Sequence, residues 1–289
     1  MHFFPDMYVQ EKDIPGVAQK PHKRLFKGVY KKGFTKDGWR KIKGHPELPI
    51  IRVCGECDSA FHVASYLSEN NLLAEWDSVI VTSQREGVGQ YGRKWFSPEG
   101  NLYLVWRLPA DFPGKEQVFN LLPLLLGAAF VDFFDQAELG VDIKWPNDLV
   151  MNDRKIGGML IKSQPGLVLA GIGINIVHAP DASLLREGAS LEPGILAENG
   201  FVGSPHDFWR KLFQFVFPFM AQAFVPEWVP DLLDVLDEVL WRKGQEVRVY
   251  PSQGESFSAT LLGLAKDGGL RLATEKGEEI LYSGSIGLP

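Results

Sequence analysis

Short β-branched runs alternate with longer helical stretches over residues 49–238, and this alternation restricts the fold more than any other feature of the chain. The short runs are apolar and bounded by turn-forming residues, which is typical of buried strands. We expect strands at 49–53, 78–82, 101–106, 141–145, 155–163 and 167–176, and helices at 59–70, 116–137, from 205 onward and at 228–240. Ser59 and Ser204 stand where helix N-caps are expected.

The character of the chain changes near residue 240. Short strands are expected at 245–250, 257–265, 269–273 and 279–282, with tight turns between them. Strands this short and closely spaced predict a small β-barrel. The sequence therefore divides into a basic N-terminal extension (1–48), a large domain (49–238) and a small C-terminal β-barrel (239–289).

Charge and composition exclude several classes of protein. The net charge of −6 argues against general nucleic-acid binding, and residues 1–48 show no helix-turn-helix pattern, so no specific DNA binding is expected. Those residues carry 11 Lys/Arg against 5 Asp/Glu, which favours a solvated arm over an arm for an acidic partner. No apolar run reaches membrane-spanning length and no secretory signal is recognisable, so a cytoplasmic location is expected. Cys54 and Cys57 form a single CxxC without a second pair, which favours two ordinary thiols.

A glycine-rich loop runs from Gln84 to Trp95. Its glycines leave backbone N–H groups free to face an anion, and Arg93 and Lys94 add positive charge at the same place. The alternative is a hairpin tip that carries basic residues. A loop of this kind is weak evidence for function when it stands alone.

The segment Lys144-Trp145-Pro146-Asn147-Asp148 follows a predicted strand and carries a stronger signal. An ammonium group can neutralise phosphate charge, and a carboxylate can hold hydrated Mg²⁺. The alternative is a turn that closes a hairpin. That alternative accounts for Pro146-Asn147-Asp148 but not for Lys144 and Trp145 before it.

Two further segments contain glycines inside strands. In 154–160, Lys155 enters a strand that becomes apolar, and Gly157 and Gly158 permit close approach of another group to the backbone; the alternative is a hairpin with a solvated lysine. In Gly171-Ile172-Gly173-Ile174-Asn175, alternating glycines leave one strand face bare. A ligand could lie over that face, or a helix could pack closely on it; the second alternative leaves the buried Asn175 without an explanation.

Taken in order, these four segments resemble the biotin–protein ligases from about residue 50 to 289, and KWPNDL is the most specific part. The resemblance implies an α+β fold with a central mixed β-sheet, helices packed on one face of it, and the C-terminal β-barrel. It implies an ATP-dependent ligase that forms biotinyl-5'-AMP with Mg²⁺ and transfers biotin to a lysine of a biotin carboxyl carrier protein. Residues 49–238 would then be the catalytic biotin- and adenylate-binding domain. No membrane association is implied, and a homodimer is left open.

The resemblance also implies roles for individual residues. Lys155 and Arg93 would be catalytic, Asp148 would bind the metal, and Trp95 would close over the ligand. The biotin-binding residues would be Ser59, Gln84, Gly87, Val88, Gly89, Gln90, Trp95, Lys155, Gly157 and Gly158, and the nucleotide-binding residues Arg93, Lys144, Asn147 and Asn175.

The chain departs from the family pattern at three places. The loop lacks three of the usual arginines, Asp58-Ser59-Ala60-Phe61 replaces the usual DSTN, and Ser285 stands where an acid is usual. Each lost charge-assisted hydrogen bond could weaken ligand binding by about 1.5–3 kcal/mol. Two alternatives therefore stay open: a ligase for a different carboxylic acid, such as a lipoate-like one, and a non-catalytic ligand-binding or regulatory homologue.

Overall fold

The structure is a computed structural model of the 289-residue chain, and it describes residues 3–4, 28–29, 49–112, 115–135, 137–181, 191–200, 203–224 and 229–289. The strands β1 (Phe3–Phe4) and β2 (Gly28–Val29) pair antiparallel. The rest of the predicted N-terminal extension, including the expected absence of a helix-turn-helix, lies outside the described residues.

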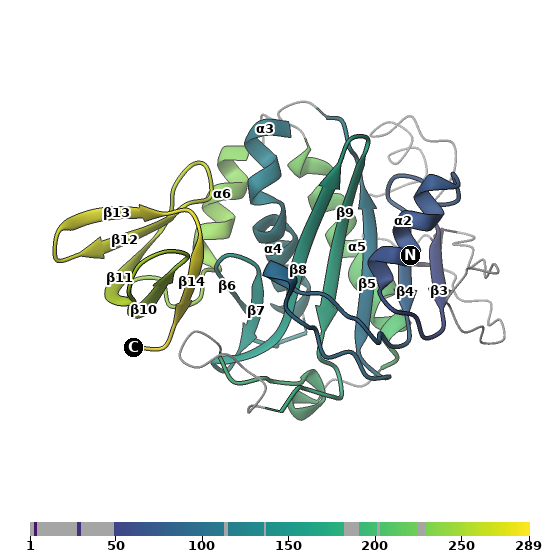
Figure 1. Ribbon diagram of the computed structural model, residues 1–289, viewed down its shortest axis with the longest axis horizontal. Helices are drawn as coiled ribbons and strands as arrows, with labels where there is room; N and C mark the ends of the chain where they lie inside the picture. Colours follow the sequence, from purple (N-terminus) through teal and green to yellow (C-terminus); the bar gives the residue numbers. More distant parts are fainter. Residues whose placement is uncertain are drawn as a thin grey trace. The chain divides into compact units, whose positions relative to one another are not determined.

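Seven strands form a central sheet in the order β3-β4-β5-β9-β8-β7-β6 (Figure 1). β3 and β4 pair parallel, whereas β4–β5, β5–β9, β6–β7 and β7–β8 pair antiparallel, which confirms the expected mixed sheet. The strands are β3 (Ile51–Cys54), β4 (Ser78–Val81), β5 (Leu102–Leu108), β6 (Asp142–Lys144), β7 (Asp148–Met151), β8 (Arg154–Gln164) and β9 (Leu167–Ile174). β7 was not predicted.

The predicted helices are present, and one is divided. The single helix expected at 116–137 is broken into α3, a 3-10 turn and α4. At the start of α5, Asp207 N donates to Ser204 Oγ at 3.2 Å, as the predicted cap requires. The helices are α2 (Ala60–Glu69), α3 (Lys115–Val118), α4 (Leu122–Asp135), α5 (Pro205–Ala223) and α6 (Val229–Glu238), with 3-10 turns η1 (Gln90–Gly92), η2 (Phe119–Leu121) and η4 (Leu196–Asn199). Among the described helices, none is both long and apolar enough to cross a membrane.

The chain forms two compact units, and β8 contributes to both. The first unit comprises residues 1–111, 159–178 and 196–221, and the second comprises 112–158, 179–195 and 222–289. The boundary predicted at 238/239 stays a prediction.

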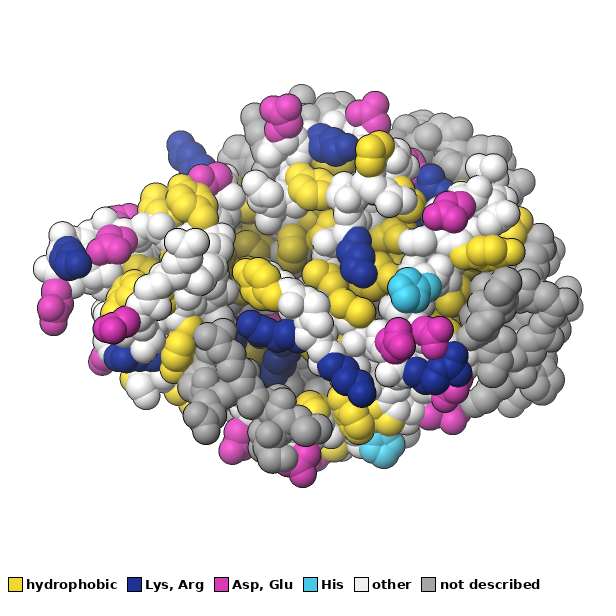
Figure 2. Space-filling view, viewed as in Figure 1, with side chains coloured by type: hydrophobic (Ala, Val, Ile, Leu, Met, Phe, Trp, Pro, Cys, Tyr) yellow, Lys and Arg dark blue, Asp and Glu magenta, His cyan; other side chains and the backbone are white. Residues whose placement is uncertain are grey.

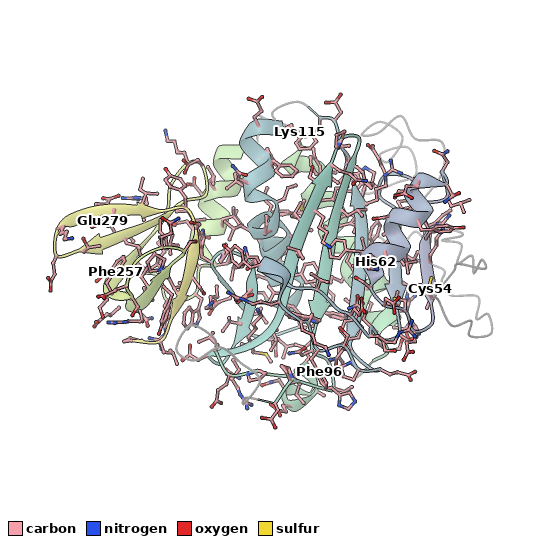
Figure 3. All side chains as sticks on the ribbon, viewed as in Figure 1. Cys54, His62, Phe96, Lys115, Phe257 and Glu279 are labelled. Carbon is pink, nitrogen blue, oxygen red and sulfur yellow. The ribbon has the colours of Figure 1, made fainter. Side chains whose placement is uncertain are left out.

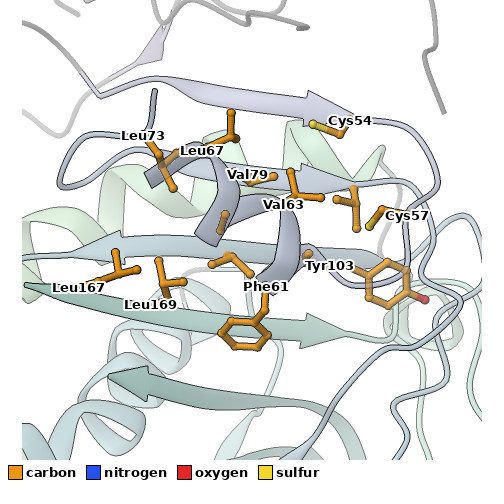
Figure 4. Packing of buried hydrophobic residues seen from close by; sticks show 14 residues of the cluster. Cys54, Cys57, Phe61, Val63, Leu67, Leu73, Val79, Tyr103, Leu167 and Leu169 are labelled. Carbon is orange, nitrogen blue, oxygen red and sulfur yellow. The ribbon is translucent and has the colours of Figure 1, made fainter. Parts of the chain in front are cut away.

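Helices cover both faces of the sheet in the first unit. Phe61, Val63 and Leu67 of α2 pack with Val79 and Tyr103 on one face (Figure 4). Successive side chains on a strand point to opposite faces, so Trp106 of β5 points away from the face of Tyr103. The Trp106 ring meets Trp209 and Phe213 of α5, with ring centroids 5.6 Å apart in each pair. The expectation of helices on one face is therefore wrong for this unit, because both alternating faces of β5 are apolar.

In the second unit α4 contacts α6 and β6, and its side chains are buried almost all round. The C-terminal sheet consists of β10 (Glu246–Pro251), β11 (Phe257–Leu264), β12 (Leu270–Thr274), β13 (Gly277–Leu281) and β14 (Gly284–Gly287). Its order is β13-β12-β11-β10-β14, and all four pairings are antiparallel. Acidic and basic side chains are mixed over its visible face (Figure 2). The predicted α+β class is confirmed, and the region expected as a β-barrel is this five-stranded antiparallel sheet.

Candidate active site

Three charged groups of the second unit meet at the β6–β7 hairpin. Lys144 and Asp148 are directly opposite each other in the antiparallel pair, joined by a turn that contains the cis peptide Trp145–Pro146. Lys144 Nζ lies 3.3 Å from Asp148 Oδ2, and Lys155 Nζ lies 2.5 Å from Asp148 Oδ1. We call these three residues the lysine cluster. The backbone therefore forms the turn of a hairpin, as the alternative interpretation expected, and this turn brings Lys144 and Asp148 together.

The three side chains of the lysine cluster differ in their exposure to solvent. The side chain of Lys144 is 2% exposed, that of Asp148 13% and that of Lys155 29%. Burial by itself raises the pKa of the Asp148 carboxyl, but the charges of Lys155 and Lys144 and their hydrogen bonds outweigh it and hold that pKa below its ordinary value. Asp148 is therefore ionised at neutral pH. Two ammonium groups around one carboxylate leave a net charge of about +1, which favours an anionic ligand.

The glycines after Lys155 keep the space beside Asp148 open. A Cβ at Gly158 would lie 3.3 Å from Asp148 Oδ1 and 3.7 Å from Lys155 Cε. Gly157 is paired with Leu149 of β7, so it belongs to the same two strands. Asn147 stands in the turn, with its carbonyl oxygen 3.5 Å from the same added Cβ. The structure thus brings together Lys144, Asn147, Asp148, Lys155, Gly157 and Gly158.

The C-terminal sheet reaches the lysine cluster in a way that the sequence did not predict. Lys144 Nζ donates to Ser285 Oγ at 3.0 Å, and Trp145 Nε1 donates to the carbonyl of Gly268 at 3.0 Å. Ser285 is 141 positions from Lys144 along the chain, so no local spacing could indicate the contact.

In the first unit, Gln84 links the glycine loop (residues 84–95) to α2. Gln84 Oε1 accepts from Ala60 N at 2.8 Å, and Gln84 Nε2 donates to Ser97 Oγ at 3.0 Å. Ser59 is the N-cap residue of α2, but its hydroxyl makes no capping bond. That hydroxyl is buried, with the residue 1% exposed, and has no hydrogen-bond partner among the described residues. A buried hydroxyl without a partner is costly, so it is a candidate for a ligand contact.

The glycine loop is a hairpin. Gly89 N donates to Arg93 O at 2.7 Å, and Trp95 N donates to Gly87 O at 2.8 Å. Val88 bridges to Lys94, Gln90 opens the 3-10 turn η1, and Arg93 is exposed with its guanidinium over the Tyr91 ring. The alternative of a hairpin tip with basic residues matches this geometry. Phe96 follows at the end of the loop (Figure 3) and is exposed.

The glycine face of β9 is covered by two aromatic side chains. A Cβ at Gly171 would overlap the Phe61 ring, and one at Gly173 would lie 2.7 Å from the Trp95 indole. Close packing with a helix is therefore the observed reason for Gly171, and Trp95 is the reason for Gly173. The bare face expected for a ligand is occupied by the protein itself.

Asn175 follows β9 and is 4% exposed, and its carbonyl accepts from Leu196 N at 3.0 Å. The residues just beyond it are held by Asn101, which sequence analysis missed. Asn101 Oδ1 accepts from the backbone N–H groups of 176, 177 and 178 at 2.9, 3.0 and 3.1 Å, and Asn101 Nδ2 donates to the carbonyl of His178 at 2.8 Å. A lone asparagine before a strand gave no signal of this role.

The predicted residues thus form two groups. The lysine cluster and its neighbours lie in the second unit, whereas Ser59, Gln84, the glycine loop with Arg93 and Trp95, and Asn175 lie in the first. Each group is coherent within its own unit. Their use in one reaction stays a prediction.

Comparison with known proteins gives matches over much of the region that carries these residues. Residues 64–177 match the model of the biotin/lipoate A/B protein ligase family. A biotin–[acetyl-CoA-carboxylase] ligase of Paracoccus denitrificans is 33% identical over 145 residues, which is 45% of this chain and 57% of the relative. The bifunctional ligase/repressor BirA of Escherichia coli K12 is 36% identical over 131 residues, 40% of this chain and 38% of the relative. The aligned part therefore spans less than two thirds of these relatives.

Solved structures show the same fold. The biotin protein ligase from Aquifex aeolicus in complex with biotin and ATP superposes with a TM-score of 0.67 at 24% identity, covering 82% of this chain and 97% of that one. At this identity the likeness concerns the fold alone. Over residues 64–177 the chain is thus similar in sequence to the biotin/lipoate A/B protein ligase family, and it shares its fold with the solved biotin protein ligases.

Proposed function

We propose that this chain is an ATP-dependent biotin–protein ligase. It would join biotin to AMP and then transfer biotin to a lysine of a biotin carboxyl carrier protein. The observation that carries the proposal is the lysine cluster, in which two ammonium groups converge on one carboxylate next to a glycine-opened backbone. An ion pair that served stability alone would need only one lysine. It would not need a second one, Lys155, whose side chain is 29% exposed.

The first step makes a carboxylate reactive. One biotin carboxylate oxygen attacks the α-phosphorus of ATP, the bond from that phosphorus to the bridging oxygen breaks, and pyrophosphate leaves with the electron pair. Negative charge gathers around the α-phosphate in the transition state. We assign Lys155 to that charge, because it is the most exposed of the three groups, and Lys144 and Arg93 to the triphosphate.

Magnesium enters this proposal as part of MgATP. Among the described residues no group of three or more His, Cys, Asp or Glu could hold a metal ion. Asp148 offers one carboxylate, and both of its oxygens are engaged by lysines. This fits an ion held mainly by phosphates and water with one carboxylate contact, which is the usual arrangement for Mg²⁺ on nucleotides. Asn147, beside Asp148, would complete the polar surroundings.

We assign the biotin end to the first unit. The Ser59 hydroxyl has no partner among the described residues and would gain one from a polar group of biotin. Gln84 keeps α2 and Ser97 in place beside it and retains one amide hydrogen and one lone pair for the ligand. Trp95 would cover the apolar part of biotin, with Gly87, Val88, Gly89 and Gln90 supplying the loop around it and Asn175 meeting the nucleotide.

In the second step, the amine of a carrier lysine attacks the acyl carbon of biotinyl-AMP. The acyl–oxygen bond breaks, AMP leaves, and the lysine loses a proton to form an amide. The transfer requires a carrier protein as partner, and we propose that it takes place in the cytoplasm.

A ligase for a different carboxylic acid is the second candidate, and one observation favours it. Phe61 and Trp95 cover the glycine face of β9, where an acid with a bulky ring would otherwise have room. A non-catalytic homologue is the third candidate.

The test uses the purified chain with radiolabelled biotin, MgATP and an isolated biotin carrier domain. We expect pyrophosphate release and a labelled carrier, and a fall of about 10²–10³-fold in adenylation for Lys155→Ala, as for loss of a transition-state donor. Lys276→Ala, which changes an exposed turn lysine of the C-terminal sheet, is the matched control.

Three results would redirect the proposal. Pyrophosphate release with lipoate or octanoate but not with biotin would favour the second candidate. Ligand binding without pyrophosphate release would favour the third. Equal turnover of Lys155→Ala and the unaltered chain would remove Lys155 from the mechanism.

A further inference from the structure

Arg85, near the start of the glycine loop, is paired with two acidic side chains of the first unit. Arg85 Nη2 lies 2.6 Å from Asp58 Oδ1, and Arg85 Nε donates to the same oxygen at 2.8 Å. Arg85 Nη1 donates to Glu56 Oε1 at 3.0 Å. One planar guanidinium thus holds two carboxylates at once, which the single ammonium of a lysine could not match in geometry. We call Glu56, Asp58 and Arg85 the arginine clasp.

The arginine clasp closes over a short pairing of two backbone segments, 56–58 and 83–86. Cys57 and Gln84 form a parallel bridge between them. The N–H groups of residues 85 and 86 donate to the carbonyls of residues 57 and 58 at 2.9 and 2.8 Å. Both segments lie beyond the ends of β3 and β4, so their pairing is separate from the ladder of the central sheet.

Each paired segment leads directly to a side chain that we assign to the acid substrate. Ser59 follows Asp58, and its buried hydroxyl has no hydrogen-bond partner among the described residues. Gln84 precedes Arg85, and its Oε1 accepts from Ala60 N at 2.8 Å. The placement of the Ser59 hydroxyl beside the Gln84 amide therefore depends on how two segments from distant parts of the sequence are held together.

The exposure of the arginine clasp limits what it can do for folding. The side chains of Arg85, Glu56 and Asp58 are 52%, 50% and 46% exposed. Exposed ion pairs are screened by solvent and salt, and they contribute little to stability. The backbone hydrogen bonds between the two segments do not need the clasp to form. Its side chains instead restrict the motion of one segment against the other, and such a restriction lowers the entropy lost when a ligand binds.

We infer that Arg85 is a positioning residue for the acid substrate, because through Glu56 and Asp58 it fixes the segment that leads to Ser59 against the segment that carries Gln84. This inference rests on the proposed function, which assigns Ser59 and Gln84 to biotin. Both carboxylates engage the Arg85 guanidinium, so Arg85 acts through its neighbours and not as a ligand contact.

The test compares Arg85→Gln, Asp58→Asn and the double variant in the full chain. Biotin binding is measured by calorimetry, and KM for biotin, KM for ATP and kcat are measured in pyrophosphate exchange. We expect Arg85→Gln to weaken biotin binding about two- to fivefold, with KM for ATP unchanged. The double variant should lose about as much as Arg85→Gln alone, because both single variants remove the same contact.

Asp58→Asn separates positioning from simple attraction. Biotin carries a negative charge, so removal of a nearby carboxylate would by itself tighten its binding. If Asp58 acts through the arginine clasp, Asp58→Asn should weaken biotin binding instead. The loss in both single variants should shrink at high salt, where half-exposed ion pairs are screened in the unaltered chain as well.

Arg271→Gln is the matched control, because Arg271 forms an ion pair of similar exposure with Glu278 in the C-terminal sheet, at 2.7 Å. It should leave biotin binding unchanged. A second readout needs no ligand: the amides of residues 85 and 86, which donate across the paired segments, should exchange hydrogen faster in Arg85→Gln and at the unaltered rate in Arg271→Gln.

The outcomes distinguish the inference from the proposed function. If the unaltered chain neither binds biotin nor exchanges pyrophosphate with it, the proposed function fails, and amide exchange at residues 85 and 86 still decides whether Arg85 holds the two segments. Unchanged exchange in Arg85→Gln overturns the inference. Tighter biotin binding by Asp58→Asn, full affinity in Arg85→Gln, or additive losses in the double variant would also overturn it.

Discussion

At Asp148, two ammonium groups share one carboxylate whose side chain is only 13% exposed. The negative charge of the Asp148 carboxylate is paired on both sides, because each of its oxygens faces a different lysine. Such a group contributes to stability only while it is ionised. The contribution of Asp148 to the free energy of unfolding should therefore depend on pH, and the direction of its pKa shift gives the sign of that dependence.

We predict that Asp148→Asn lowers the free energy of unfolding at pH 7 by about 1–3 kcal/mol, because two lysine charges lose their counter-charge. The pKa of Asp148 is lowered in the folded chain, so the unfolded chain binds more protons just below the ordinary Asp value. The stabilisation is present above about pH 4 and is lost as pH falls through the folded pKa. Urea unfolding at several pH values should show the two proteins converging below pH 4.

Glu275→Gln is a suitable control, since Glu275 is exposed in a turn of the C-terminal sheet. Its unfolding curve should follow that of the unaltered chain at every pH. A constant difference between Asp148→Asn and the unaltered chain down to about pH 2 would contradict the assignment.

The charged residues of the site could be predicted from the sequence, but their neighbours could not. Lys144 and Asp148 lie four positions apart across a turn with proline, so their meeting follows from local chain geometry. Ser285 and Asn101 act through contacts made by distant strands, and their residue types are common at surfaces. Tertiary packing alone decides such contacts.

Among the elements, the glycine loop contains two glycines, Gly87 and Gly89, that can be compared as a test position and its control. A Cβ at Gly87 would lie 2.5 Å from both Ser97 Oγ and the Trp95 carbonyl oxygen, and a backbone oxygen cannot move unless the surrounding chain moves with it. A Cβ at Gly89 would meet Arg93 O at 3.6 Å, an ordinary contact. The two glycines stand two residues apart in the same hairpin.

We predict that Gly87→Ala weakens biotin binding about tenfold or more, because the hairpin must open where Trp95 bonds to Gly87. Gly89→Ala should stay within about twofold of the unaltered chain, a change of less than 0.5 kcal/mol. Calorimetry with biotin measures both. Equal effects at the two positions would mean that the loop rearranges freely, contrary to the packing at Gly87.

Elements with strong periodicity were predicted well, and those defined by pairing were missed. β4 and β9 are continuous apolar runs and were placed within two residues of the observed bounds. β14 contains two glycines in four residues, so its sequence has low β propensity and only its ladder with β10 makes it a strand. The break between α3 and α4 was also missed, since the apolar pattern continues through it.

For the whole molecule, the two groups of site residues predict which stretches of chain each ligand protects most. Hydrogen exchange should show MgATP protecting residues 144–158 of the second unit, and biotin protecting residues 84–95 of the first. Strand β13, at the end of the C-terminal sheet, should exchange alike in all samples and serves as the internal reference.

Protection of β13 alone by MgATP, or an unchanged glycine loop with saturating biotin, would contradict the assignment of the two groups. The sequence could not anticipate this division, because each unit is assembled from separated stretches of chain and β8 contributes to both.

The two cysteines have a practical consequence for chemical labelling. Cys54 and Cys57, the only cysteines in the chain, are both buried, and burial raises the pKa of the Cys57 thiol to about 12. A maleimide reacts with an accessible thiolate, so the folded protein should label slowly. A cysteine introduced at exposed Tyr282 would then take a fluorophore selectively in the native state. A site-specific dye can therefore test the proposed docking of a carrier protein without first removing the native thiols.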